Sequence, residues 1–135
     1  MNIEKFTAAS RALLSDAQMI AAKNNHQQIL PLHFLSALLN EENAIISNLI
    51  NTIGADNNLI ASACAEELER IPSVEISGGG GQINMSSDGL KLLEKALSLA
   101  KSNKDSFVTL ERIFEAISYD KTAAGKILAK HAIDS

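Results

Sequence analysis

The sequence contains no tryptophan, one cysteine and two prolines, and aromatic residues make up only 4% of its 135 residues. Without aromatic bulk, the core must be built from Leu, Ile and Ala, which lets helices pack closely. The lone Cys64 cannot form an internal disulfide and is typical of a reducing compartment. Its neighbours Ala63 and Leu68 indicate a small buried helix residue rather than a nucleophile.

Basic clusters and long apolar runs are also missing. The formal net charge is -4, so we expect no surface for nucleic acid, which would have to neutralise phosphates. No stretch approaches the ~18 continuous apolar residues of a membrane span, and the N-terminus carries no signal-peptide pattern. We therefore expect one cytoplasmic domain covering residues 1–135, with no membrane contact and no need for a metal in order to fold.

What the sequence does contain is a repeat. The chain aligns with itself without a gap when it is shifted by 79 residues, which places Leu13 on Leu92 and Ala17 on Ala96. Because the matched residues follow helical spacing, one amphipathic helical unit is encoded twice. We therefore predict an all-α fold: a tandem repeat of two four-helix units with pseudo-two-fold symmetry. Repeat one covers about 1–70, a linker covers 71–85, and repeat two covers about 86–135.

Apolar spacing, capping residues and helix breakers predict seven helices. We place them at about 3–23, from Pro31 to near Asn40, over 45–53 with an end at Gly54, from a cap at Asp56 or Asn57 to about Arg70, after a cap at Ser86 or Ser87, after a cap at Thr109, and over 122–131. The four glycines at 78–81 indicate a flexible linker. A phosphate-binding loop would need a Lys and a Ser or Thr directly after them, and Gln82 and Ile83 follow instead.

The repeat register also predicts that a helix is missing. Asp56, which opens the fourth helix, aligns with Ser135. Either the second unit lacks its fourth helix, or the sequence stops just before it. We expect apolar surface to be left uncovered beside the fifth and seventh helices.

No group of residues indicates catalysis or metal binding. His26, His33 and His131 do not fall at the spacing of three or four that zinc sites use on a helix. No nucleophile with a base and no catalytic signature is present. We therefore expect no enzyme activity, no cofactor and no metal.

Three polar residues have two interpretations. Locally, Thr7 is an early polar residue of the first helix, Asp105 is a loop acid, and Glu111 compensates the dipole of the sixth helix. Alternatively, the loop before the sixth helix and the start of the first helix form one rim. That rim would offer a hydroxyl and two carboxylates beside the apolar Leu93, and it could bind extended apolar or basic polypeptide.

Several segments resemble the N-terminal domain of Clp-family unfoldases. They are Phe6 and Thr7 with residues 12–18, then residues 29–39, and residues 107–114. Residues 70–75, followed by glycine-rich sequence, are similar to the linker of the ClpB-type disaggregase rather than to that of the ClpA or ClpC type. The resemblance covers nearly the whole chain.

This resemblance implies a non-catalytic module that engages unfolded or aggregated polypeptide and passes it to a hexameric ATPase ring. The ATP-binding modules themselves would lie outside this chain. The resemblance places Thr7, Asp105 and Glu111 at polar positions for substrate contact, and Leu93 at an apolar groove position. Arg112 departs from the apolar residue or His that the family usually carries there. The alternative is an adaptor-docking domain of a ClpA- or ClpC-type protease unfoldase, which binds one folded partner tightly.

Overall fold

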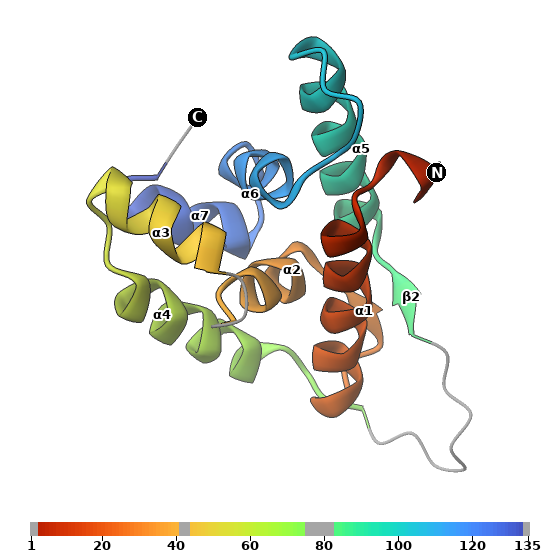
Figure 1. Cartoon of the computed structure of the whole chain (residues 1–135). Helices are drawn as coiled ribbons and strands as arrows, with labels where there is room; N and C mark the ends of the chain where they lie inside the picture. Colours follow the sequence, from red (N-terminus) through yellow and green to blue (C-terminus); the bar gives the residue numbers. More distant parts are fainter. Residues whose placement is uncertain (1–2, 41–43, 75–82, 134–135) are drawn as a thin grey trace.

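The structure is a computed structural model that describes residues 3–40, 44–74 and 83–133 (Figure 1). In these ranges the fold is all-α, as predicted, with two very short strands. The elements are the 3-10 helix η1 (Ile3–Lys5), α1 (Ala8–Lys23), β1 (Gln28–Ile29), α2 (Pro31–Leu38), α3 (Ala44–Ile53), α4 (Asn57–Arg70), β2 (Asn84–Met85), α5 (Ser87–Ser102), α6 (Leu110–Ser118) and α7 (Ala123–Lys130). None of these helices combines the length and apolar character needed to cross a membrane.

Capping residues start and stop the helices where the sequence predicts. The side chains of Asp56, Ser86 and Thr109 each accept a hydrogen bond from a backbone N–H in the first turn of α4, α5 and α6. Pro31 occupies the first position of α2, where its missing N–H costs nothing. Gly54 follows α3 with a φ of 94°, a left-handed conformation that favours glycine.

The first helix begins later than predicted. The expected start at Ile3 is wrong, because Phe6 leaves the helical path and forms a parallel bridge with Val108. The Thr7 N–H donates to the Val108 carbonyl at 3.1 Å, and the Val108 N–H donates to the Lys5 carbonyl at 2.6 Å. Thr7 then caps α1, so a tertiary contact between distant segments sets this boundary.

The two units repeat in detail. α1 and α5 start and end 79 residues apart, α1 packs on α2 as α5 packs on α6, and the α2–α7 contact mirrors the α3–α6 contact. The side-chain amides of Asn24 and Asn103 each donate to the carbonyl four residues earlier, at 2.8 and 2.7 Å. The next residues, Asn25 and Lys104, both adopt the left-handed conformation, with φ values of 56° and 59°.

The short strands tie one unit to the other. β1 and β2 pair in parallel with Ile29 opposite Met85, and the Phe6–Val108 bridge is the same pairing in the 79-residue register. β2 lies inside the predicted linker 71–85, whose glycines at 78–81 lie outside the described residues, and neither strand was predicted from the sequence. With only two residues per strand, no alternating pattern exists to reveal them.

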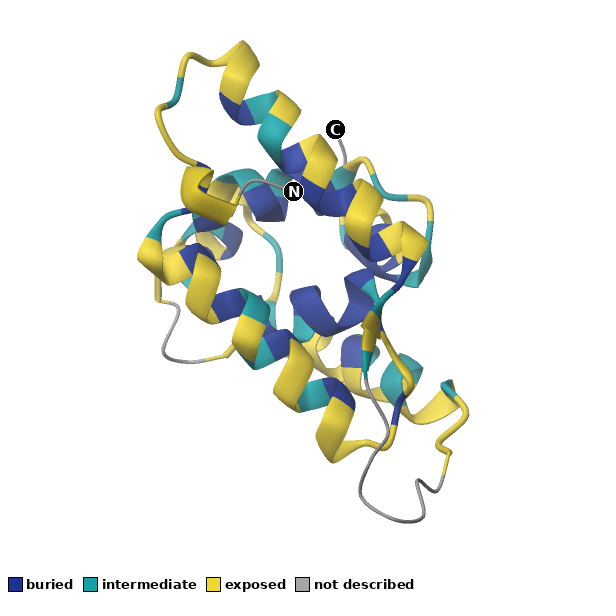
Figure 2. Cartoon of the chain, turned by 90° about the vertical axis from the view of Figure 1, so that its right-hand side faces the viewer, coloured by how far each residue is buried: buried dark blue, intermediate teal, exposed yellow. Residues whose placement is uncertain are grey.

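The core consists mainly of Leu, Ile and Ala, as the scarcity of aromatic residues predicts. Figure 2 shows the buried residues on the inward faces of the helices, with exposed residues on the outside. Cys64 is 2% exposed, and desolvation by burial raises the pKa of its thiol to about 12. A thiol that stays protonated at neutral pH is a packing residue rather than a nucleophile.

Candidate functional site

The start of α1 and the loop before α6 lie side by side. Besides the backbone bond from Thr7, the Val108 carbonyl accepts a hydrogen bond from Ser10 Oγ at 2.9 Å. Thr7 Oγ1 accepts from the Ser10 N–H at 3.1 Å and donates to Ser10 Oγ at 2.9 Å. The Thr7 backbone N–H and the Ser10 hydroxyl therefore hold the start of α1 against this loop, and the Thr7 hydroxyl caps α1.

Asp105 and Arg112 form an ion pair along the same loop. Arg112 Nε lies 2.7 Å from Asp105 Oδ2, and Arg112 Nη1 lies 2.8 Å from Glu115 Oε1. Glu111 is exposed in the first turn of α6, and within the described residues its carboxylate has no hydrogen-bond or ion-pair partner. Of the two predicted carboxylates, Glu111 is thus the one that remains free to meet a ligand.

A pocket of about 500 Å³ opens between the C-terminal half of α5, η1 and this loop. Phe107 is 52% exposed at the pocket, and Leu97 adds an apolar side chain from α5. We call this the Phe107 pocket; it is lined by Lys5, Leu97, Ser98, Ala100, Lys101 and residues 105–108. It offers apolar surface bordered by charges of both signs.

Only one of the five predicted site residues lines the Phe107 pocket, namely Asp105. Thr7 and Arg112 contact the residues of the loop. Leu93 does not lie on the surface: it is 2% exposed and belongs to the core. The role of Leu93 as an apolar groove residue stays a prediction, and Leu97, one turn later on the same face of α5, lines the pocket.

Sequence reasoning did not single out Phe107, Leu97 or Lys101. The sequence does mark Phe107 as a large apolar residue in a loop, just before Val108 and the helix cap Thr109. Nothing in the local pattern shows that Val108 is buried and Phe107 is not, because the bridge to Phe6 decides which of the two faces the core.

The first unit carries a buried counterpart of the Asp105–Arg112 pair. In the 79-residue register these residues correspond to His26 and His33, whose Nδ1 and Nε2 atoms lie 2.8 Å apart. The Leu30 N–H donates to His33 Nδ1, so His33 carries its proton on Nε2 and donates it to His26. In each unit, a side-chain pair thus joins the loop after the first helix to the second helix. The His26–His33 pair of the first unit is buried and neutral, and the Asp105–Arg112 pair of the second unit is charged and half-buried.

Burial controls the chemistry of this histidine pair. Desolvation, followed by repulsion from His26, lowers the pKa of His33 to about 4, and desolvation lowers the pKa of His26 as well. The sequence spacing predicted no grouping of the three histidines, but in the structure His26 and His33 lie together. In the described part of the chain, no group of three or more His, Cys, Asp or Glu side chains is placed to hold a metal ion.

Known proteins share this sequence and fold. Chaperone protein ClpB from Rickettsia conorii is 55% identical over 135 residues, which is 100% of this chain and 16% of that protein. The chain thus spans about a sixth of the length of the relatives that it matches. The Hsp104 N-terminal domain from Candida albicans has a TM-score of 0.83 at 23% identity, covering 96% of this chain and 83% of that domain.

A structure of the ClpV N-domain in complex with a VipB peptide also has this fold, with a TM-score of 0.73 at 16% identity over 96% of this chain and 80% of that one. The model of the Clp repeat (R) N-terminal domain matches residues 5–131. That range includes both helical units, the Phe6–Val108 bridge and the Phe107 pocket. The duplicated helical fold and this match together show that the chain belongs to the Clp repeat (R) N-terminal domain family.

Proposed function

We propose that this chain is a non-catalytic polypeptide-binding module of a protein disaggregase chaperone. Its ligands are unfolded or aggregated polypeptides, and they bind in the Phe107 pocket and along the adjoining rim of Thr7 and Glu111. The observation that carries the proposal is the exposed aromatic ring of Phe107, which lies beside Leu97 and between Lys5, Lys101 and Asp105.

The chemistry of the pocket suits an unfolded chain. Unfolded polypeptide exposes apolar side chains that a folded protein buries, and burial against Phe107 and Leu97 removes them from water. The carboxylate of Glu111, which has no partner within the described residues, favours segments with basic flanking residues. Such contacts select a class of polypeptide rather than a single sequence, as a disaggregase requires.

The ClpB relatives support a wider role for the parent protein. In that role the module passes polypeptide to a hexameric ring whose own modules bind and hydrolyse ATP, and this chain hydrolyses nothing. The lone buried thiol of Cys64 is consistent with a cytoplasmic location.

Substitution of Phe107 tests the proposal. We expect F107S to weaken the binding of several unrelated denatured proteins roughly tenfold, because it removes an apolar contact worth one to two kcal/mol. The matched control is L59S, which removes an exposed apolar side chain from α4, where Leu59 is 55% exposed. Both variants should keep their stability, and only F107S should bind poorly in a fluorescence-anisotropy titration.

The carboxylates provide a second test. D105A and E111A should weaken binding while the domain stays folded. Asp105 forms one half-buried ion pair, worth about 1 kcal/mol, and Glu111 forms none within the described residues. Early unfolding of either variant would mean that its carboxylate is structural. Unchanged binding by F107S, D105A and E111A would place the site elsewhere. Tight binding of one folded partner, without binding of unrelated unfolded proteins, would support the adaptor-docking alternative.

A further inference from the structure

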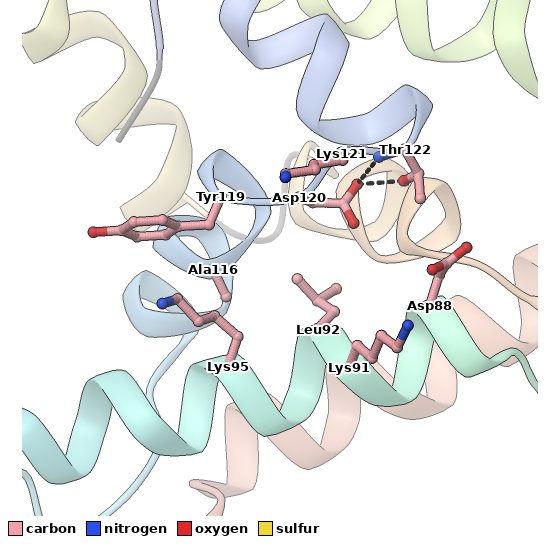
Figure 3. A pocket seen from close by; sticks show the side chains of 9 residues that line it. All are labelled: Asp88, Lys91, Leu92, Lys95, Ala116, Tyr119, Asp120, Lys121 and Thr122. Atoms are coloured by element: carbon pink, nitrogen blue, oxygen red, sulfur yellow. Dashed lines mark hydrogen bonds between the residues drawn. The ribbon is translucent and has the colours of Figure 1, made fainter.

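A second pocket, of about 420 Å³, lies on another side of α5 and shares no lining residue with the Phe107 pocket. Figure 3 shows it between α5 and the connection from α6 to α7. We call it the lysine pocket; it is lined by Asp88, Lys91, Leu92, Lys95, Ala116, Tyr119, Asp120, Lys121 and Thr122. Leu92 and Ala116 form an apolar floor, and three ammonium groups surround it.

The two carboxylates of this pocket are already compensated. Asp120 Oδ2 accepts hydrogen bonds from the backbone N–H groups of Thr122 and Gly125, at 3.0 and 3.3 Å, and from the Thr122 hydroxyl. Its negative charge therefore stabilises the N-terminus of α7. Asp88 lies in the first turn of α5, where the helix dipole likewise favours an acid.

The lysines have fewer internal partners. Lys95 Nζ lies 4.2 Å from the centre of the Tyr119 ring, which orients its ammonium at the edge of the pocket. Lys91 and Lys121 are exposed, and neither forms an ion pair within the described residues. The pocket thus has a positive rim on a domain whose net charge is -4.

The first repeat shows that the fold does not need these charges. In the 79-residue register, Lys91 and Lys95 correspond to Ala12 and Asp16 of α1, a helix of the same length in the same packing arrangement. The positive rim is therefore a property of the second unit alone. A charge pattern that packing does not require is available for recognition.

We propose that the lysine pocket is a second docking site, which binds a polypeptide segment carrying carboxylates next to a small apolar side chain. The apolar side chain lies over Leu92 and Ala116, and the carboxylates pair with Lys91, Lys95 and Lys121. Complementary charge gives this site a preference opposite to that of the carboxylate rim at Glu111. The domain can thereby hold an acidic segment and a basic or apolar segment at the same time.

The test uses a fluorescein-labelled dodecapeptide that alternates Glu and Ala, and a second peptide in which Lys replaces Glu. We expect the acidic peptide to bind, with an affinity that falls as salt rises, and K91A/K95A to weaken it about tenfold. The matched control K126A/K130A removes two exposed lysines at the same spacing from α7 and should bind like wild type. The methyl resonances of Leu92 should shift on titration in NMR spectra.

Several results would overturn the proposal. One such result is that the acidic peptide does not bind. Another is that K91A/K95A and K126A/K130A weaken its binding equally, which would indicate unspecific charge attraction. If D105A weakens the binding of the acidic peptide and K91A/K95A does not, the peptide binds in the Phe107 pocket. Stronger binding of a single-stranded oligonucleotide of equal charge would make the rim a phosphate site instead. Circular dichroism of each variant verifies that a loss of binding is not a loss of folding.

Discussion

At the scale of single residues, Thr7 combines a structural and a proposed binding role, and its substitutions separate the two. T7A removes the side chain that accepts from the Ser10 N–H, so it should lower the free energy of unfolding by about 1 kcal/mol. T7S keeps a hydroxyl that can cap α1 and should preserve stability. Urea denaturation of both variants measures this difference, and equal stability of T7A and wild type would show that the cap contributes little.

The histidine pair gives a pH dependence whose sign follows from burial. The pKa of His33 is about 4 in the folded protein and about 6.5 in the unfolded chain, so between these values the unfolded state binds more protons. The pair's contribution to stability is complete above pH 6.5. The part that His33 contributes falls as the pH drops toward 4, by roughly 3 kcal/mol.

Denaturation series at several pH values check this dependence. In H33Q the loss of stability between neutral and acidic pH should be smaller than in wild type, because no imidazole remains at that position to be protonated on unfolding. An H33Q slope equal to that of wild type would mean that carboxylates elsewhere dominate the acid response.

At the scale of elements, the sequence predicted the helices better than their connections. Apolar spacing and the caps Asp56, Ser86 and Thr109 placed the helices, because those signals lie within a few residues of each boundary. The start of α1 and the two strands depend on pairing between segments far apart in the chain, and such pairing leaves no local pattern. The candidate site residues remain predictions: Asp105 lines the Phe107 pocket, and Leu93 is buried.

Gly125 packs closely against the backbone of Asp120, a contact that helix propensity does not predict. By propensity alone, a glycine inside α7 is a weak point. In the structure, a Cβ at this position would lie 1.8 Å from the Asp120 carbonyl oxygen, a backbone atom that no rotamer change can move. The α6–α7 connection therefore requires a residue without a side chain there.

We predict that G125A lowers the free energy of unfolding by at least about 2 kcal/mol, despite the higher helix propensity of alanine. K126A, at the next and exposed position, should change it by less than about 0.5 kcal/mol. Urea denaturation of the two variants measures the contrast. A G125A variant as stable as wild type would mean that α7 moves away from Asp120 without cost.

At the scale of the whole molecule, the two duplicated units share one helix arrangement but carry different surface residues. The His26–His33 pair and the Asp105–Arg112 pair fix the same loop to the same helix, but only the second unit presents charges there. Likewise, Lys91 and Lys95 of the lysine pocket correspond to Ala12 and Asp16 in the first unit. The first unit thus acts as an internal reference: residues shared by both copies serve the fold, and residues that differ are candidates for binding.

The repeat also locates the surface that an eighth helix would cover. The repeat register predicted uncovered apolar surface beside the fifth and seventh helices. In the structure, α4 packs mainly on α2, α3 and α7, so the counterpart of α4 would pack on α6, α7 and α3. There, α3 leaves Ile45 and Ile53 exposed, at 56% and 47%, on either side of the partly buried Leu49.

If such a helix follows in the parent protein, a chain extended by its natural continuation should melt several degrees higher than the 135-residue chain. The substitutions I45S and I53S together should remove most of that gain, because they delete apolar surface that the added helix buries. In the shorter chain the same substitutions should change the melting temperature little, since both side chains are already exposed to water. Equal melting temperatures for the two lengths, or an equal effect of the substitutions on both, would show that α3 is not the surface that a further helix covers.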